Sequence, residues 1–401
     1  MTENKLTKNK KIWLHLLIVA LPVVVVLAII FVVVIRGNTS GANEDHVPAF
    51  VETPTEEPTD EPTEAAPTEE APPYDPYQSA RWDYPPEEPT DPRPRSFLTG
   101  MPIDEADLMR RPIAVVINNL FQALPQSGIS SADIVYEVLA EGDVTRLVGI
   151  FQSDIPEKIG PVRSARDSFI DFAFNHDAIF VHHGRSPDAN TRLNATRITN
   201  LDGMSLEGTV FWRDRTYPAW HHNSGTRPLE HSSYTSRQRI ETHMASRSIR
   251  DTVGEDPAYG FVFGAVPSVG AGAANTVTVP FSVPYARTFI FDPDTGLYFV
   301  ENRDGPLKDA ENQTQVTVRN ILVQQTTMRV TGDLGQRTIG TVGSGDGYLI
   351  TGGMYQRVSW AKDSHTSPMR WYFEDGSPLV LAPGPTWICV FQITGTVVFE
   401  G

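Results

Sequence analysis

RPIAVVINN (residues 111–119), IVYEVLAEG (134–142), TRLVGIFQS (145–153), SARDSFIDFAFNHD (164–177) and AIFVHHG (178–184) are the stretches that decide the fold of this chain. Three of them, RPIAVVINN, TRLVGIFQS and AIFVHHG, are short apolar runs of a kind typical of buried strands, and IVYEVLAEG suggests a further element whose type the pattern leaves open. In the fourth, apolar residues follow a serine at helical spacing, so we expect a helix that is capped near Ser164. Strands that alternate with helices predict an α/β domain.

The flanking sequence extends this domain over residues 96–250. SPDANTRLNAT (186–196) and SSYTSRQRIETHMAS (232–246) predict two further helices. Residues 251–280 contain the Gly/Ala-rich stretch AVPSVGAGAAN (265–275) and predict a linker between two domains.

Residues 281–401 predict a second domain that is mostly β. Its turn-like stretches are DPDTG (292–296), GSGDG (343–347) and EDGSP (374–378). The expected strands lie in ARTFIFDPDTGLYFVE (286–301), TVRNILVQQTTMRV (317–330), GDGYLITGG (345–353), YQRVSWA (355–361), MRWYFEDGSPLVLA (369–382) and TWICVFQI (386–393). No period of 20–50 residues recurs, which excludes repeat architectures.

A long apolar segment precedes the folded part. IWLHLLIVALPVVVVLAIIFVVVI (12–35) has twenty-four residues and no formal charge. As a helix it would extend roughly 36 Å, enough to cross a hydrocarbon core of about 30 Å, whereas the apolar part of a cleavable signal is about 7–15 residues long. Lysines in the basic tail 1–11 predict a single-pass signal-anchor with a cytoplasmic N-terminus and an extracytoplasmic bulk. The alternative is a signal peptide cleaved near residues 37–42.

Residues 37–95 form an acidic segment rich in proline and threonine, as in TPTEEPTDEPTEAAPTEEAPPYDP (53–76). Within it, residues 44–92 carry fifteen acidic side chains and one basic side chain, Arg81. Such a composition cannot bury enough apolar surface to fold, so we expect a disordered linker with a reach on the order of 170 Å. The alternative is an O-glycosylated stalk or a docking strip for a basic partner.

Composition excludes several classes of protein. The formal net charge is -16, and the lysines and arginines form no basic stripe, so we expect no nucleic-acid partner. One cysteine, Cys389, excludes an internal disulfide framework and a cysteine-rich zinc site. Because Cys389 lies in an apolar run, we expect a buried, inert thiol.

The quoted stretches resemble the bacterial YerB-type family, a pair of domains of unknown function on exported, membrane-attached proteins. The resemblance rests on RPIAVVINN (111–119), QSGISSADIVYEVLAEG (126–142), TRLVGIFQSDIPEKIGPVRSARDSFIDFA (145–173), AIFVHHGRSPDA (178–189), FDPDTGLY (291–298), VGSGDGYLITGG (342–353), VSWAKDS (358–364), RWYFEDG (370–376) and PGPTWICV (383–390). It covers most of residues 100–400 and implies a location and a domain order, but no reaction.

This chain departs from the family's pattern at two places. Members are generally attached through a lipidated cysteine, where this chain has the apolar run and the acidic linker. Members also tend to carry a compact Pro-His-Asn-x-Tyr-Thr-Ser stretch. The corresponding AWHHNSGTRPLEHSSYTS (219–236) is longer, so either His222 with Asn223 or His231 fills that place.

The densest group of polar residues is GPVRSAR (160–166), just before the expected helix. At a helix N-terminus, the backbone N–H groups and the guanidinium groups of Arg163 and Arg166 could face one anion. We therefore predict an anionic-ligand site there. The alternative is a buried ion-pair network among Asp133, Glu137, Glu141, Arg146, Arg163 and Arg166.

Further candidate ligand residues flank this cluster. Asn118, Asn119, Gln126 and Ser127 flank the end of the first expected strand, where α/β folds commonly bind ligands. FWRDR (211–215) could recognise a carbohydrate or a partner, or form a salt-bridged turn, and its polar residues are Arg213, Asp214 and Arg215.

The histidines do not predict a metal site. Five of them fall within fifty residues: His182, His183, His221, His222 and His231. His182 and His183 are adjacent on an expected strand and point to opposite faces, and no HExxH-type spacing occurs. We expect no metal and no cofactor, and keep His182 and His183 as polar candidates for the ligand site.

Ser359 and Lys362 match the SxxK spacing of penicillin-recognising serine enzymes. That chemistry needs the serine at the start of a helix, whereas QRVSWAKDS (356–364) alternates as a strand does, so we do not expect it here.

Together these features indicate a membrane-anchored extracytoplasmic protein. We expect a non-enzymatic module that binds an anionic cell-envelope polymer or an envelope protein. The alternative is an envelope hydrolase or transferase acting on an anionic polymer. In that case Arg163 and Arg166 would orient the anion, and the general base would be His182, His183 or His222.

Overall fold

The computed structural model describes residues 91–222, 225–254, 261–267, 271–332 and 335–401. The expected basic tail (1–11), apolar span (12–35) and most of the acidic linker (37–90) lie outside these residues, as does Asn223. Among the helices that the structure describes, none is both long enough and apolar enough to cross a bilayer.

The part up to residue 254 contains both helices and strands. The helices are α2 (Glu105–Leu108), α3 (Asp167–Phe174), α4 (Pro187–Thr196), α5 (Gly203–Leu206) and α6 (Arg237–Ser246), with 3₁₀ turns η1 (Phe121–Ala123), η2 (Ile129–Ser131) and η3 (Leu229–His231). The strands are β1 (Ile113–Asn118), β2 (Ile134–Leu139), β3 (Thr145–Phe151), β4 (Ile179–His182), β5 (Asn200–Asp202), β6 (Trp212–Arg213) and β7 (Ser233–Tyr234). The strands and helices predicted from the quoted stretches are present, and serine side chains cap α4 and α6.

Helix α3 begins later than the sequence predicts. Ser164, the expected cap, lies outside the helix, and Arg166 occupies the N-cap position with an extended backbone. The Ser164 hydroxyl donates to the carbonyl oxygen of His183 (3.1 Å), and Ala165 forms a β-bridge with Arg185. These contacts keep the segment extended as far as Arg166, so the predicted cap was wrong by two residues.

From residue 261 onward the described chain is mostly β, as predicted. Its strands are β8 (Val262–Phe263), β9 (Gly272–Ala273), β10 (Thr276–Pro280), β11 (Ala286–Asp292), β12 (Leu297–Asn302), β13 (Gly305–Pro306), β14 (Thr317–Val318), β15 (Asn320–Thr326), β16 (Met328–Val330), β17 (Arg337–Ile339), β18 (Gly343–Thr351), β19 (Met354–Lys362), β20 (Arg370–Phe373), β21 (Val380–Leu381), β22 (Thr386–Gln392) and β23 (Val398–Glu400). Three of them, β8, β9 and β10, lie in the segment 251–280, which the sequence predicts as a linker.

The glycine-rich stretch 343–347, which the sequence predicts as a turn, is the first half of strand β18. A Cβ atom at Gly347 would lie 2.2 Å from the carbonyl oxygen of Val323 and 3.2 Å from the ring of Trp371. Glycine is therefore required at Gly347 by the close approach of neighbouring strands, and the predicted turn was wrong.

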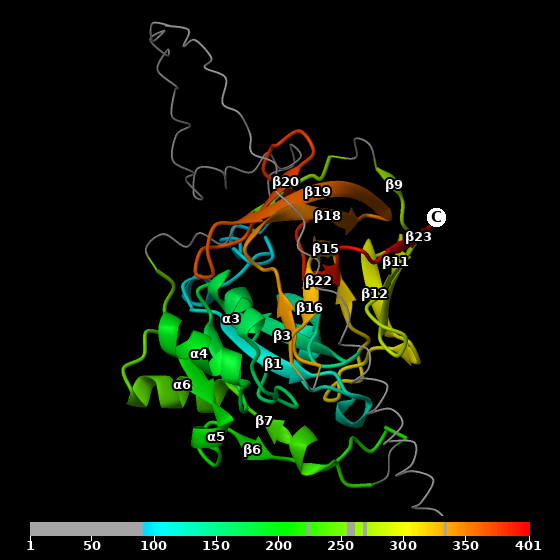
Figure 1. Ribbon diagram of the computed structural model, residues 1–401. Coiled ribbons are helices and arrows are strands. Elements are labelled where there is room, and N and C mark those ends of the chain that lie inside the picture. The colour runs from blue at the N-terminus through cyan, green and yellow to red at the C-terminus, as the bar shows by residue number, and fades with distance from the viewer. Residues whose placement is uncertain (1–90, 223–224, 255–260, 268–270, 333–334) are drawn as a thin grey trace, which may run out of the picture. The chain divides into compact units, whose positions relative to one another are not determined.

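One sheet contains strands from both parts of the chain (Figure 1). Its order is β20-β19-β18-β15-β22-β2-β3-β1-β4-β5, with β9 beside β19. The two parts meet where β22 runs parallel to β2, with Ile134 opposite Thr386 and Val138 opposite Val390. The strands on either side of segment 251–280 thus form a continuous sheet, a pairing that the sequence did not predict.

A second sheet, ordered β13-β12-β11-β10-β23 with β14 beside β12, lies on the side away from helices α3, α4 and α6 (Figure 1). The two sheets meet at Trp387 and Phe289, both fully buried, whose ring centroids lie 6.1 Å apart. On the helical side, Tyr136 of β2 stacks on Phe172 of α3 at 4.5 Å. Burial of each such side chain stabilises the fold by about 1.5–3 kcal/mol, so the shared core joins both parts of the chain.

Candidate functional site

The predicted anion-binding segment 160–166 crosses between the ends of β1 and β4. The backbone N–H of Arg163 donates to the carbonyl oxygen of Val116 (2.9 Å), and the N–H of His183 donates to the carbonyl oxygen of Arg163 (3.0 Å). Arg163 is therefore held by both strands, close to His183.

Arg146 and Arg166 are neutralised by one acid. Glu141 accepts from Arg146 Nη2 at 2.9 Å and also pairs with Arg166 Nη2. Two further donors reach backbone oxygens: Arg146 Nη1 donates to Ser164 (2.9 Å), and Arg166 Nη1 donates to Ala165 (2.6 Å). Arg166 Nε is buried without a partner among the described residues. For these two arginines the structure contains the ion-pair network that the sequence offered as the alternative. They are not available to an anion in this arrangement.

Arg163 differs from these two arginines. No described residue lies within hydrogen-bond or ion-pair distance of its guanidinium group, and its Nε is fully buried without a partner. Burial lowers the pKa of Arg163 below its ordinary value, Glu230 opposes this shift, and the charge of Arg213 adds to it. A half-buried cation is thus left without a counter-charge in contact.

His183 lies beside Arg163 with both ring nitrogens occupied. Nε2 accepts from Arg213 Nη2 (3.0 Å), so Nδ1 carries the proton and donates to Ser233 Oγ (2.8 Å). Burial lowers the pKa of His183, and Arg213 lowers it further, which keeps the ring neutral. Arg213 itself is paired with Glu207, at 2.9 and 3.0 Å.

His231 is held in the same way by Asn118. Asn118 Oδ1 accepts from the N–H of Leu120 (3.1 Å), so its NH₂ group donates to His231 Nδ1 (2.7 Å). Burial lowers the pKa of His231, and the charge of Arg163 lowers it further. From the sequence, His231 was only one of two candidates within residues 219–236. Its contact with Asn118 could not be predicted, because the two residues lie 113 positions apart in the chain.

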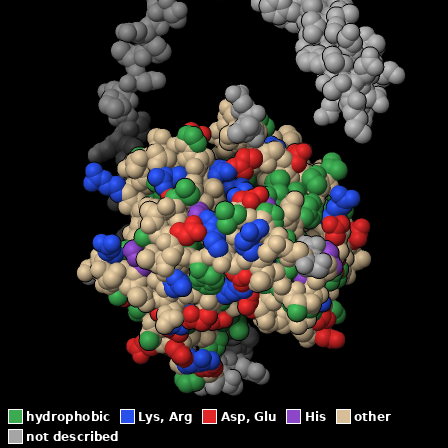
Figure 2. Space-filling view, turned by 90° about the horizontal axis from the view of Figure 1, so that it is seen from below, with side chains coloured by type: hydrophobic (Ala, Val, Ile, Leu, Met, Phe, Trp, Pro, Cys, Tyr) green, Lys and Arg blue, Asp and Glu red, His purple; other side chains and the backbone are tan. Residues whose placement is uncertain are grey.

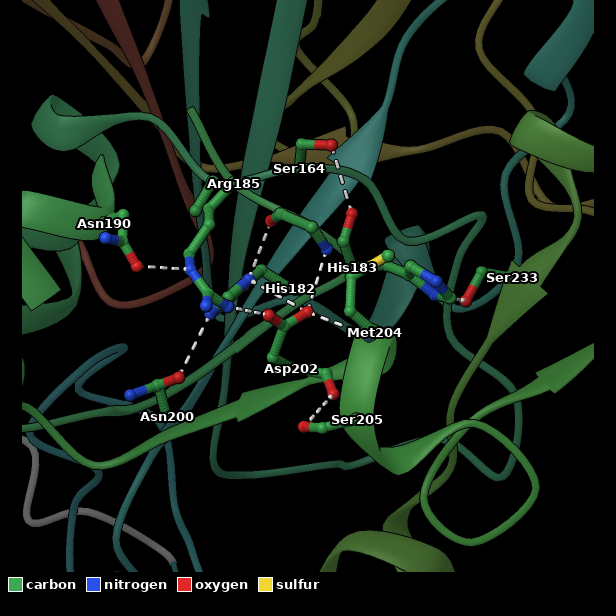
Figure 3. A network of polar contacts seen from close by, with 12 residues as sticks. Ser164, His182, His183, Arg185, Asn190, Asn200, Asp202, Met204, Ser205 and Ser233 are labelled. Carbon is green, nitrogen blue, oxygen red and sulfur yellow. Dashed lines mark hydrogen bonds and ion pairs between the residues drawn. The ribbon is translucent and has the colours of Figure 1, made fainter. Parts of the chain in front are cut away.

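The side chain of His182 has other hydrogen-bond partners than that of His183 (Figure 3). Its Nδ1 contacts the carbonyl oxygen of Gly184 (2.8 Å), and its Nε2 contacts Asn200 Oδ1 (3.2 Å). Nearby, Asp202 accepts from the N–H of Gly184 (2.9 Å) and pairs with Arg185, which points away from the His183 side chain. The side chains of the two adjacent histidines thus have different hydrogen-bond partners, although Asp202 acts on the pKa of both.

Glu137 accepts hydrogen bonds from several buried side chains and does not contact Arg163. It forms a buried bidentate pair with Arg287 of β11, at 2.7 and 3.0 Å, and each side chain is only 2% exposed. Three further donors reach its carboxylate: Thr145 (2.9 Å), Trp387 (3.2 Å) and Asn119 (3.3 Å).

The remaining predicted ligand residues are engaged with their neighbours. Gln126 Nε2 donates to Asn119 Oδ1 (3.0 Å), and Ser127 Oγ donates to Glu311 (2.7 Å). On the FWRDR loop, Asp214 pairs with Lys158 (3.0 Å), and Arg215 Nε donates to the carbonyl oxygen of Arg227 (2.7 Å). The ion pairs of this loop are made with residues outside it, Lys158 and Glu207, and not between Asp214 and the two arginines of the loop.

On the face shown in Figure 2, lysine and arginine side chains are interspersed with acidic ones, and no patch of a single charge sign is seen. Nor do three His, Cys, Asp or Glu side chains converge as metal ligands anywhere in the described residues. Ser359 and Lys362 lie on strand β19. Cys389 is buried, and burial raises the pKa of its thiol. Arg163 is a half-buried predicted site residue for which the described residues provide no counter-charge in contact.

Two matched family models cover most of the folded part. They are described as "Protein of unknown function (DUF3048) N-terminal domain", at residues 98–250, and "Protein of unknown function (DUF3048) C-terminal domain", at residues 277–388.

Individual relatives agree with the family models. A Bacillus subtilis (strain 168) protein named "Putative lipoprotein YerB" is 33% identical over 297 residues, which are 73% of this chain and 84% of the relative. The crystal structure of the YerB protein from Bacillus subtilis has a TM-score of 0.66 at 29% identity and covers 76% of this chain and 100% of that chain. The chain therefore belongs to the YerB-type family, whose N-terminal and C-terminal domains it carries in that order.

Proposed function

We propose that this protein is a membrane-anchored extracytoplasmic binding module that holds an anionic group of its ligand at Arg163. The observation that carries the proposal is the half-buried guanidinium group without a described partner. Leaving a buried donor unsatisfied costs about 1–3 kcal/mol, and more for a charged group. A carboxylate or phosphate would match the planar fork of donors and remove this cost.

The location in the proposal is supported by the relative and by the sequence. The Bacillus subtilis relative is named a lipoprotein, which supports a membrane-attached, extracytoplasmic position. The apolar run 12–35 and its flanking charges predict a single span with a cytoplasmic N-terminus. The ligand would then be an anionic cell-envelope polymer or the acidic surface of an envelope protein.

Binding is favoured over the hydrolase or transferase alternative. A general base needs a nitrogen lone pair that can reach the proton it removes. In His183 and His231 the acceptor nitrogen is already occupied, by Arg213 and Asn118 respectively. These two histidines near Arg163 are thus not free to accept a proton.

The test is a binding titration of the purified full chain with isolated anionic envelope polymer, and with inorganic phosphate as a defined probe. We expect Arg163→Gln to weaken binding about tenfold or more, because a charge-assisted contact contributes about 1.5–3 kcal/mol. Arg163→Lys should retain only part of the affinity, because it keeps the charge but loses the fork.

The matched control is Arg247→Gln, which removes an exposed arginine near the end of α6. It should bind as the wild type does. If Arg163→Gln is folded and still binds both probes with wild-type affinity, the Arg163 site is not a ligand site.

A further inference from the structure

A pocket lined by none of the Arg163-site residues lies between the two family domains. Its volume is about 400 Å³, within the roughly 300–1,000 Å³ of small-molecule sites. We refer to it as the aromatic pocket and define it by six of its lining residues: Phe121, Trp220, His222, Asn302, Asp304 and Lys308. The first three belong to the N-terminal domain and the last three to the β12–β13 hairpin of the C-terminal domain.

Two aromatic rings are presented on this pocket. Phe121 is 43% exposed and Trp220 is 38% exposed, so both rings have accessible area in the pocket. Both are anchored: Phe121 stacks on Tyr285 with ring centroids 5.3 Å apart, and Trp220 Nε1 donates to the carbonyl oxygen of Ala310 (3.3 Å). Each ring is fixed by the protein and still leaves area for a ligand.

The buried side chain of Arg227 connects the segments that carry these two rings. Arg227 is 1% exposed, lies 4.5 Å from the ring centroid of Tyr217, and donates to the carbonyl oxygen of Pro125 (3.0 Å). The Tyr217 hydroxyl in turn donates to the carbonyl oxygen of Gln122 (2.9 Å). The segments that bear Phe121 and Trp220 are therefore tied together before any ligand arrives, which lowers the entropy cost of binding.

The part of the lining that comes from the C-terminal domain includes polar side chains, with both donors and acceptors. Arg287, which is locked by Glu137, also contacts Asn302 Oδ1 and so fixes this amide. Asp304 adds a carboxylate and Lys308 an ammonium group on the same hairpin. Because charges of both signs are present, the pocket is not built for a ligand of one charge sign.

From this arrangement we infer that the aromatic pocket binds a carbohydrate. A sugar ring presents an apolar C–H face, which packs on an aromatic ring, and hydroxyl groups that both donate and accept hydrogen bonds. Exposed aromatic rings and amide, carboxylate and ammonium groups that line one pocket match both features. An acidic proline-rich peptide, such as the chain's own segment 53–76, matches less well, because Asp304 would repel it. The inference does not depend on the Arg163 site.

The experiment is a calorimetric titration of the full chain with two neutral probes, the tetramer of N-acetylglucosamine and cellotetraose. At least one should bind saturably, with an affinity that changes little between low and high salt, because no net charge is neutralised. Phe121→Ala and Trp220→Ala should each weaken binding about tenfold or more, as expected for central aromatic contacts. Trp220→Phe, which keeps an aromatic face, should restore most of the affinity.

Met204→Ala is the matched control, since Met204 is an apolar side chain that is 72% exposed and lies outside the aromatic pocket. It should bind as the wild type does, and thermal unfolding should show that every variant is folded. The inference is overturned if neither oligosaccharide binds saturably, or if the two aromatic variants bind them as tightly as the wild type. It is also overturned if a peptide of residues 53–76 binds instead, in a salt-dependent manner that Lys308→Gln abolishes.

Discussion

His176 is a titratable side chain that the fold keeps away from water. It follows helix α3, is 1% exposed, and its Nε2 contacts the Tyr136 hydroxyl at 2.8 Å while Nδ1 has no partner among the described residues. Burial lowers the pKa of His176 to about 3, and the charge of Lys362 contributes to this shift. Between pH values of about 3 and 6.5, the ring is therefore neutral in the folded protein and charged in the unfolded protein.

This difference predicts an acid-sensitive stability. The folded pKa of about 3 lies below the ordinary value of 6.5, so the unfolded state binds the extra proton between these values. The free energy of unfolding should therefore fall as the pH drops below 6.5, by up to about 1.4 kcal/mol per pH unit from this residue. His176→Gln, which does not titrate, should flatten the slope by that amount in urea unfolding between pH 7 and pH 4.5. Equal slopes for the two proteins would contradict the assignment.

At the scale of single residues, sequence reasoning identified Arg163 but not its surroundings. Glu141, which neutralises Arg146 and Arg166, was one of three acidic partners that the sequence offered, with Asp133 and Glu137. The partner of Glu137 could not, because Arg287 lies 150 residues away. Positions in the sequence show which charged side chains are near one another along the chain. Long-range packing decides which of them has no counter-charge in contact.

Strands β2 and β11 belong to different sheets and are connected by the buried Glu137–Arg287 pair. We expect this pair to contribute to the free energy of unfolding. Arg287→Met should destabilise the protein by about 3–5 kcal/mol in urea unfolding, because it leaves a buried carboxylate without its counter-charge. Adding Glu137→Gln should recover part of this loss.

The control for this prediction is Arg237→Met, which removes the exposed i,i+4 pair with Glu241 on helix α6. A surface pair of this kind contributes about 0.3–0.5 kcal/mol. If Arg287→Met costs no more than this control, the buried pair does not hold the sheets together.

At the scale of elements, the sequence predicts the types of the elements better than their boundaries. Apolar runs correctly predicted strands such as β1 and β22, since hydrophobic periodicity is a local property. The start of α3 was missed because Ser164 bonds to His183 from another strand. The glycines of β18 were missed because the constraint on Gly347 comes from Val323 and Trp371.

The continuous sheet predicts that the two family domains do not fold independently. Without β22, strand β2 would lose its parallel neighbour, and Trp387 would no longer cover the core. We expect separate fragments 91–254 and 261–401 to lack cooperative thermal unfolding, and a mixture of the two to regain it. The measurement is circular dichroism with temperature, together with the dispersion of amide signals in NMR. A cooperative transition in fragment 91–254 alone would contradict this expectation.

The pairing of β2 with β22 could not be predicted from the sequence. Both runs are apolar on both faces, so their patterns show that each is buried but not which neighbour buries it. For the same reason the aromatic pocket was not anticipated, since its walls come from segments about 100 and 180 residues apart.

Because the chain is synthesised from its N-terminus, strand β2 is made well before its partner β22. Glu137 and Trp387 contact each other across 250 residues. At about 5–20 residues per second, translation would need roughly 12–50 s to add that length. During this interval β2 has an open edge that can pair with other chains. A nascent chain of this family therefore needs a holding factor, or a delay in folding, until its final large strand has been made.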